Sequence, residues 1–114
     1  MKKTSILAIV TMALLGIQNG FAENKSEKFK VSGNCEMCEK RIEKAAQGVA
    51  GVTKADWNKD TKLMTVDFDA AKTSLDKVEA AIAKAGHDTP LHKAEAKTYK
   101  ALPECCQYER PATK

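Results

Sequence analysis

The sequence has no Arg-rich block, and only its first segment contains a long apolar run. Acidic and basic residues are interspersed, which is typical of a solvated surface and not of a nucleic-acid-binding face. No apolar run after Ile17 is long enough to form a transmembrane helix. Internal repeats and low-complexity tracts are also lacking. We therefore expect no nucleic-acid partner and no membrane-embedded domain.

The residue sets that catalysis commonly needs are absent as well. The chain has no Ser/His/Asp set, no phosphate-binding loop and no paired-carboxylate arrangement. The sequence therefore predicts a protein that is not an enzyme.

Residues 1–22 have the three parts of a signal peptide. Lys2 and Lys3 form a basic start, residues 5–17 are apolar and uncharged, and Gly20 and Ala22 place small residues at the −3 and −1 positions. The apolar run is short for a membrane anchor, and no Cys lies near the cleavage site, which argues against a lipoprotein. We expect cleavage after Ala22 and export to a bacterial periplasm. The exported chain would keep 92 of the 114 residues and a formal charge of +2, enough for one small domain.

Hydrophobic periodicity divides the exported part into short elements. Alternation predicts strands over 28–31, 55–57 and 64–68, and a weak edge strand over 87–91 that contains Pro90. Helical spacing predicts helices from Cys38 to Gly48 or Gly51 and from 75 to 85, with Thr73 or Ser74 as the second N-cap and Gly86 as its stop. A polar leader covers 23–27. A polar tail covers 93–114, with a helical turn near 98–102 before Pro103.

The order β-α-β-β-α-β predicts an α+β fold, the ferredoxin-like βαββαβ sandwich. In this arrangement two helices cover one face of a four-stranded antiparallel sheet. The expected domain covers residues 28–92, between the leader and the tail. We expect a monomer.

Cys35 and Cys38 form a CxxC pair where the first strand gives way to the first helix. Two thiols at this spacing can clamp one soft metal ion or close as a disulfide, and an oxidising compartment favours the disulfide. A two-thiolate site suits Cu(I) best, then Hg(II), whereas Zn(II) prefers four ligands. The start of a helix lowers the pKa of a thiol, so we expect Cys38 to form a thiolate near neutral pH.

The motifs around this pair resemble those of the heavy-metal-associated domain family. The resemblance rests on Ser-Gly-Asn-Cys-Glu-Met-Cys at 32–38, Arg-Ile-Glu-Lys-Ala at 41–45, Gly51-Val52 and Ala85-Gly86-His87, and it covers 28–91. The family includes copper chaperones, amino-terminal modules of copper-pumping ATPases and the periplasmic mercury-binding protein. It usually has Gly-Met-Thr before the first Cys, so Gly33 stands here in place of a buried Met.

The resemblance implies metal binding by Cys35 and Cys38 and transfer of the metal through a shared intermediate with an incoming thiol. The implied partner is a metal-transporting ATPase, a membrane transporter or another periplasmic metalloprotein. Met37 could offer a thioether, although packing or exposure to solvent is the simpler expectation.

Three further residues could join the site. His87 lies in a loop that returns near the CxxC pair in this fold, as a third ligand or as a solvated histidine. Cys105 and Cys106 in the tail could fold back and make a three- or four-sulfur centre, which would shift the preference toward Zn(II), Cd(II) or a Cu(I) cluster. They could instead form a disulfide or stay idle.

Two other functions use the same cysteines. A thiol–disulfide oxidoreductase also carries CxxC at a strand–helix junction. Against it, the chain has no Trp before Cys35, no apolar central strands and no Pro suited to a facing cis loop. A domain stapled by disulfides is the third interpretation, but the two amphipathic helices already supply a core.

Overall fold

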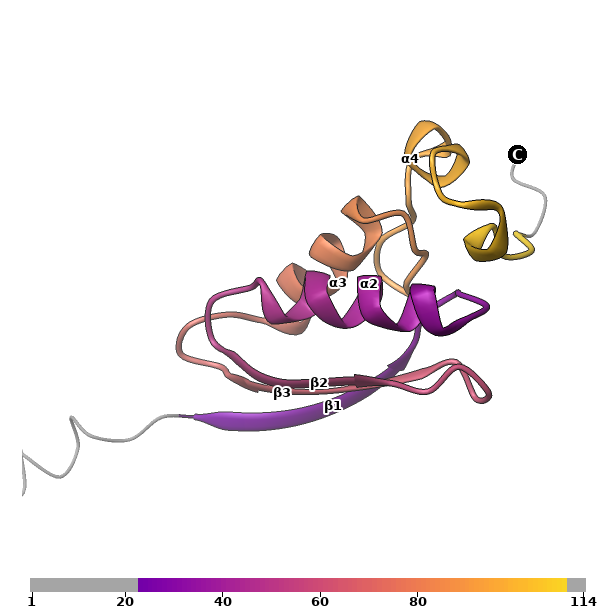
Figure 1. The fold of residues 1–114 in the computed structure, drawn as a ribbon. Coiled ribbons are helices and arrows are strands. Elements are labelled where there is room, and N and C mark those ends of the chain that lie inside the picture. Colours follow the sequence, from indigo (N-terminus) through magenta and orange to yellow (C-terminus); the bar gives the residue numbers. More distant parts are fainter. Residues whose placement is uncertain (1–22, 111–114) are drawn as a thin grey trace, which may run out of the picture.

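The computed structural model describes residues 23–110, so the predicted signal peptide and its cleavage site lie outside the described residues. The elements in chain order are β1 (Asn24–Lys30), α2 (Glu36–Gln47), β2 (Val52–Trp57), β3 (Leu63–Asp69), α3 (Leu75–Lys84), α4 (Ala96–Lys100) and the 3₁₀ turn η1 (Glu104–Cys106). Helices α2 and α3 lie on one face of the sheet (Figure 1). The α+β class and the positions of both helices confirm the sequence prediction.

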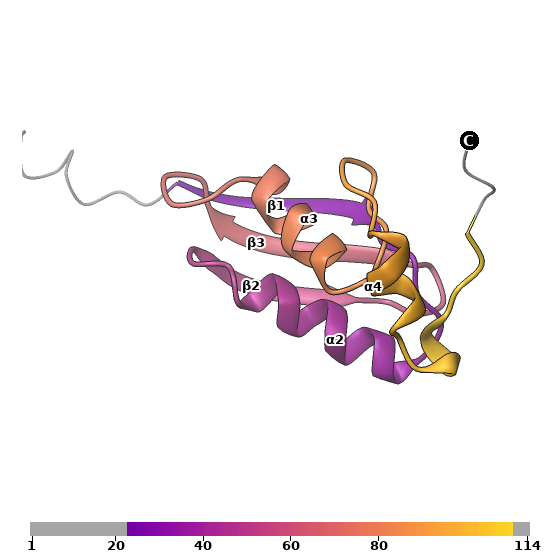
Figure 2. The same ribbon diagram turned by 90° about the horizontal axis from the view of Figure 1, so that it is seen from above.

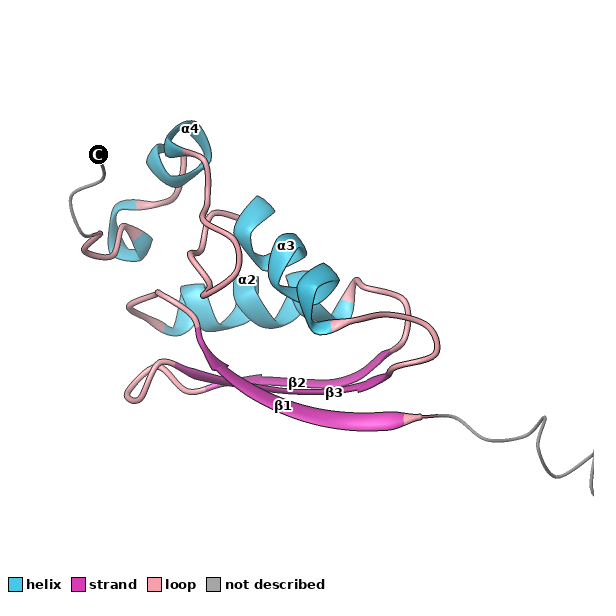
Figure 3. Cartoon of the chain, turned by 180° about the vertical axis from the view of Figure 1, so that it is seen from behind, coloured by secondary structure: helices cyan, strands magenta, loops and turns pink. Residues whose placement is uncertain are grey.

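The sheet has the order β1-β3-β2, and both pairs are antiparallel (Figure 2). Figure 3 shows the three strands as one layer beneath the helices. Central strand β3 alternates as expected: Met64, Val66 and Phe68 are buried toward the helices. Each strand pair brings an aromatic residue beside Met64, namely Phe29 from β1 and Trp57 from β2. Burying side chains of this size contributes about 1.5–3 kcal/mol each, so this face supplies much of the core.

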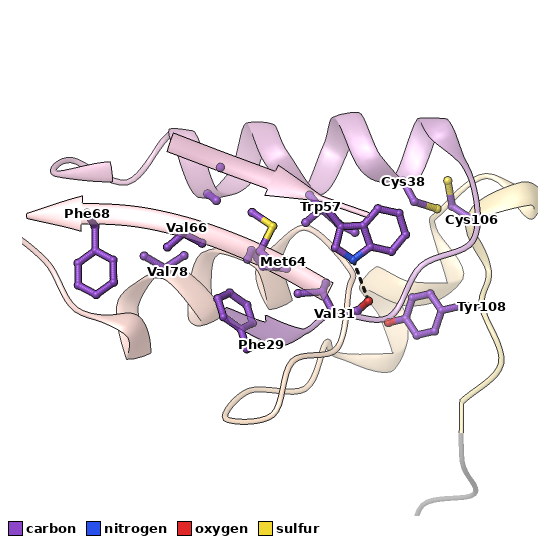
Figure 4. Packing of buried hydrophobic residues seen from close by; sticks show 14 of the residues in the cluster. Phe29, Val31, Cys38, Trp57, Met64, Val66, Phe68, Val78, Cys106 and Tyr108 are labelled. Carbon is purple, nitrogen blue, oxygen red and sulfur yellow. Dashed lines mark hydrogen bonds between the residues drawn. The ribbon is translucent and has the colours of Figure 1, made fainter. Parts of the chain in front are cut away.

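Helices α2 and α3 pack on one face of the sheet and cover the core. Their buried residues are Cys38, Ile42 and Ala46 on α2 and Val78, Glu79, Ile82 and Ala83 on α3. Figure 4 shows the cluster running from Phe68 at one end to Cys38, Cys106 and Tyr108 at the other. The cysteine end of the domain is therefore continuous with its hydrophobic core.

The expected fourth strand over 87–91 is wrong for this structure, because the described residues form a three-stranded sheet. A single backbone bond approaches such pairing: the Ser32 N–H donates to the Asp88 carbonyl at 3.0 Å. The Asp88 N–H donates instead to the Tyr108 hydroxyl at 3.0 Å, and Pro90 has no N–H to donate. Contacts with the tail, with α3 and within the segment thus take the place of a strand ladder.

Several element ends differ from the sequence prediction or decide between its alternatives. Strand β1 begins at Asn24, not Lys28, and α2 begins at Glu36, with Cys35 as its extended N-cap. Gly48 ends α2, and the Ser74 hydroxyl caps α3 by accepting the Lys77 N–H at 3.3 Å.

The tail folds back over the domain. Its helix α4 is close to the predicted turn, and η1 contacts α2 (Figure 2). Gly86, the predicted stop of α3, has φ +111°, and a Cβ there would lie 2.9 Å from Leu102 Cδ2. Glycine therefore serves both the turn and the docking of the tail. Within residues 23–110, none of the helices has the length and apolar character needed to cross a membrane.

Candidate metal centre

The CxxC pair lies at the start of α2. Cys35 is the N-cap and Cys38 lies in the first turn, so their sulfurs approach to 3.5 Å. The Asn34 N–H donates to Cys38 Sγ at 3.4 Å. Cys38 is fully buried, whereas Cys35 is half-buried. The junction thus presents one accessible and one enclosed sulfur.

The tail brings the other two cysteines to the same point. Cys35 Sγ lies 3.5 Å from Cys105 Sγ and 3.7 Å from Cys106 Sγ, and the two tail sulfurs lie 3.9 Å apart. Cys106 is buried beside Cys38 at the end of the core (Figure 4). Cys105 is exposed. All four cysteines are free thiols. Of the alternatives left open by the sequence, the structure shows the folded-back tail.

Two side chains from α2 border the tail cysteines. Arg41 Nη1 donates to Cys106 Sγ at 3.1 Å, and Met37 Sδ lies 3.6 Å from Cys105 Sγ. Met37 is exposed, which is one of the two alternatives to ligation that its sequence position left open. A guanidinium in this position stabilises negative charge on the sulfurs.

The four thiols differ in acidity. Burial raises the pKa of Cys35, but hydrogen bonds from the Cys38 N–H and from the neighbouring thiols outweigh it and lower the pKa to about 7. Burial raises the pKa of Cys38 to about 11. The pKa of Cys105 is raised by its contact with Cys35, and that of Cys106 by burial. The expectation that Cys38 is the acidic thiol is therefore wrong, because its burial in the core outweighs the hydrogen bond from the Asn34 N–H.

Trp57 fills the space below the loop that carries the cysteines. Its indole N–H donates to the Val31 carbonyl at 3.1 Å (Figure 4), and a Cβ on Gly33 would lie 2.9 Å from the ring. The ring thus occupies room that a side chain larger than glycine would need. This compensates for the Gly that stands where the family usually has Met.

His87 is near the loop but outside the sulfur cluster. Its Nδ1–H donates to the Ser32 carbonyl at 2.8 Å, since a carbonyl can only accept. Its Nε2 is buried without a hydrogen-bond partner among residues 23–110, and burial lowers its pKa. The expected solvated histidine is wrong. Among the described residues, the groups with metal-ligand spacing do not include His87. Its role as a metal ligand therefore stays a prediction.

A second group with such spacing is acidic: Glu39, Glu43 and Asp56. The Glu43 carboxylate already accepts a hydrogen bond from the backbone N–H of Trp57 at 2.9 Å. Its pKa is raised by burial. We read this group as structural.

Sequence reasoning missed the residues that dock the tail. The Tyr108 hydroxyl donates to the Gly86 carbonyl at 2.8 Å, and Arg110 pairs with Asp88 through Nε at 2.9 Å and Nη2 at 3.0 Å. Tyr108 also stacks on His87 and meets Tyr99 edge to face. The only sequence signal for this docking is a Tyr and an Arg shortly after the Cys pair. Hydrophobic periodicity does not detect such a signal.

Comparison with known proteins identifies the family. The family model of the heavy-metal-associated domain matches residues 28–88. A mercuric transport protein periplasmic component from Shewanella putrefaciens is 35% identical over 86 residues, which are 75% of this chain and 94% of that protein. A copper-exporting P-type ATPase from Bacillus subtilis is 36% identical over 75 residues, but the match spans only 9% of the ATPase.

Solved structures agree with this match. The CopZ metallochaperone superposes with a TM-score of 0.55 at 30% identity, covering 57% of this chain and 98% of that one. The Cu(I)-loaded N-terminal domain of a potential copper-translocating P-type ATPase from Bacillus subtilis gives 0.55 at 27% identity, covering 58% and 84%. This chain belongs to the heavy-metal-associated domain family.

Proposed function

We propose that this protein is an exported carrier that binds one soft metal ion through Cys35 and Cys38 and passes it to a partner. The observation that carries the proposal is the pair of free sulfurs 3.5 Å apart at the start of α2, one of them accessible. A thiol with a pKa of about 7 is partly ionised at neutral pH, so Cys35 can supply a thiolate ligand at that pH.

The relatives support both candidate metals. Two relatives, from Shewanella putrefaciens and Pseudomonas aeruginosa, are mercuric transport proteins, and others are copper proteins. Thiolates prefer soft ions, so Cu(I) is our first choice and Hg(II) the second. The ion is cargo, and the protein carries it without catalysis.

The location and the partner follow from the same proposal. The signal-peptide pattern and the periplasmic relatives support export, with a chain that begins at Glu23. Metal-transporting P-type ATPases among the matches make a membrane metal transporter the proposed partner. Mass spectrometry of the protein secreted to the periplasm would test the cleavage after Ala22.

A competition titration tests metal binding. The reduced protein is titrated with Cu(I), and separately with Hg(II), against a chromogenic chelator, beside the variant Cys35→Ser/Cys38→Ser. We expect one ion per chain and at least a hundredfold loss of affinity in the variant, about 2.7 kcal/mol. Equal affinity of the two proteins would overturn the proposal.

A thiol–disulfide oxidoreductase is the second candidate. The low pKa of Cys35 beside three other thiols favours it, because thiolates attack disulfides. A redox protein would reduce a model disulfide such as insulin without metal, with the Cys35–Cys38 thiols becoming a disulfide as the substrate disulfide becomes two thiols. A metal carrier would lose this reactivity once one equivalent of Cu(I) is bound.

A further inference from the structure

We propose that Cys105 and Cys106 complete the metal centre, so that one soft ion is held by the thiolates of Cys35, Cys105 and Cys106. Cys38 lies beside this triad as a fourth sulfur. The inference rests on the proposed function and refines its ligand set: Cys35 stays a ligand of the ion, and the two tail cysteines take the place of Cys38. It changes the site from an open two-sulfur clamp to a closed three-sulfur centre.

The spacing of the three sulfurs fits one ion. Their separations of 3.5, 3.7 and 3.9 Å describe a nearly regular triangle. Its centre lies about 2.1 Å from each sulfur, close to the metal–thiolate bond of about 2.3 Å known for zinc. An ion placed there would need only a small adjustment of the side chains.

The CxxC pair alone fits a linear site poorly in this geometry. Two opposite bonds of about 2.3 Å would hold their sulfurs about 4.6 Å apart. The Cys35 and Cys38 sulfurs are 3.5 Å apart, which suits a bent arrangement with a further ligand. The sulfurs of Cys35, Cys105 and Cys106 offer one ion a full set of three ligands without any opening of the loop.

The charge around the triad also suits three thiolates. Each thiol that binds the ion releases its proton to water, and the ion keeps its oxidation state. Three thiolates around Cu(I) carry an excess of two negative charges. Arg41 at 3.1 Å from Cys106 and the N-terminus of α2 at Cys35 offset part of that charge.

The tail is held in place by contacts that do not involve the cysteines. The Tyr108 side chain is buried, and its hydroxyl bonds to the Gly86 carbonyl and the Asp88 N–H. Arg110 forms two bonds to the Asp88 carboxylate and one to the Ala94 carbonyl at 2.8 Å. The tail thus presents its two sulfurs to Cys35 before an ion arrives, which lowers the entropic cost of a third ligand.

Accessibility gives the closed centre a route for release. Cys105 is exposed and Cys35 half-buried, whereas Cys38 and Cys106 are buried. An incoming thiolate can therefore replace Cys105 first, and the displaced Cys105 thiolate takes up a proton from water. The tail acts as a clasp that strengthens binding and slows transfer.

X-ray absorption and affinity measurements on the reduced protein test the clasp. One equivalent of Cu(I) is added to the wild type, to Cys105→Ser/Cys106→Ser and to Glu104→Gln, which changes an exposed neighbour in the same turn. We expect three sulfurs per copper in the wild type and Glu104→Gln, and two in the double variant. The double variant should bind Cu(I) at least tenfold more weakly and release it faster to a thiol competitor.

Two results would overturn the inference. One is an equal sulfur number and affinity in the wild type and the tail variant, while Cys35→Ser/Cys38→Ser loses binding; the proposed function would then stand alone. The other comes from the wild type, independently of how the variants fold. If one equivalent of Cu(I) protects only Cys35 and Cys38 from alkylation, Cys105 and Cys106 are not ligands. Retained binding in Cys35→Ser/Cys38→Ser would instead contradict the proposed function.

Discussion

At the scale of single residues, acidity separates Cys35 from the other three thiols. Hydrogen bonds lower its pKa to about 7, whereas the pKa of Cys38 rises to about 11 through burial. We predict that iodoacetamide labels Cys35 first, with a rate that climbs through pH 7 as the thiolate forms and falls away at lower pH. Mass spectrometry of the metal-free protein after short labelling at pH 5–10 measures this.

The variant Cys38→Ala is the control for this experiment. It removes the side-chain hydrogen bond from Cys38 to Cys35 but leaves the Cys35 thiol accessible. The inflection should move upward in pH. A wild-type inflection near 9, the ordinary value for a cysteine, would contradict the prediction.

Gly33 shows which part of the packing under the loop could be predicted from the sequence. The missing buried Met was visible in the sequence, but the compensation was not, because Trp57 reaches the loop from another strand. A Cβ at Gly33 would lie 2.9 Å from the indole ring and 3.2 Å from Cys38 Cβ. We predict that Gly33→Ala costs about 1–3 kcal/mol of unfolding free energy through overpacking. Urea unfolding followed by Trp57 fluorescence measures it.

Gly48→Ala is the matched control for Gly33→Ala. A Cβ at Gly48 would meet only backbone oxygens at 3.5 Å, an ordinary contact. Its φ of −71° is open to any residue. Equal losses in the two variants would mean that Trp57 does not crowd the loop.

At the scale of elements, the start of α3 offers a paired test. The sequence left Thr73 and Ser74 as alternative caps, and the structure selects Ser74. We predict that Ser74→Ala costs about 0.5–2 kcal/mol of stability, as for other N-caps. The Thr73 hydroxyl is buried and has no hydrogen-bond partner among the described residues, so Thr73→Val should be neutral or stabilising.

Thermal unfolding of both variants decides between the caps. A large loss in Thr73→Val with none in Ser74→Ala would reverse the assignment. Thr73 lies beside Gly51, beyond the C-terminal end of α2, whereas Cys35 lies at the start of α2. The Cu(I) affinity of both variants should therefore match that of the wild type.

Local periodicity predicted β2, β3, α2 and α3 because each buries one face against the others. The predicted strand over 87–91 is wrong for a physical reason that hydrophobic periodicity does not reflect. The Asp88 N–H donates to the Tyr108 hydroxyl in the tail. The N–H groups of His87 and Leu91 donate to Ile82 and Glu79 of α3, and that of Thr89 donates to the His92 carbonyl, so none of them is free for a strand ladder. Long-range side-chain contacts of this kind leave no repeating signal in the sequence.

At the scale of the whole molecule, the CxxC half of the candidate site was predictable and the tail half was not. The spacing of Cys35 and Cys38 at a strand–helix junction is a local pattern. The approach of Cys105 to Cys35 across seventy residues depends on the docking of Tyr108 and Arg110 against 86–94. No local rule places a polar tail, so its return to the site had to come from the structure.

The coupling between metal and tail yields a prediction for the entire fold. With the tail undocked, Cys35 and Cys38 would still hold the ion, but at least tenfold more weakly. The ion therefore shifts the docking equilibrium by the ratio of the two affinities, at least tenfold or about 1.4 kcal/mol. One equivalent of Cu(I) should slow hydrogen exchange at the amides of 99–108 by about tenfold or more. Hydrogen exchange with mass spectrometry measures this in the wild type and in Cys105→Ser/Cys106→Ser. Protection of α2 alone, or equal protection of the tail in both proteins, would show that the ion does not bridge the domain to its tail.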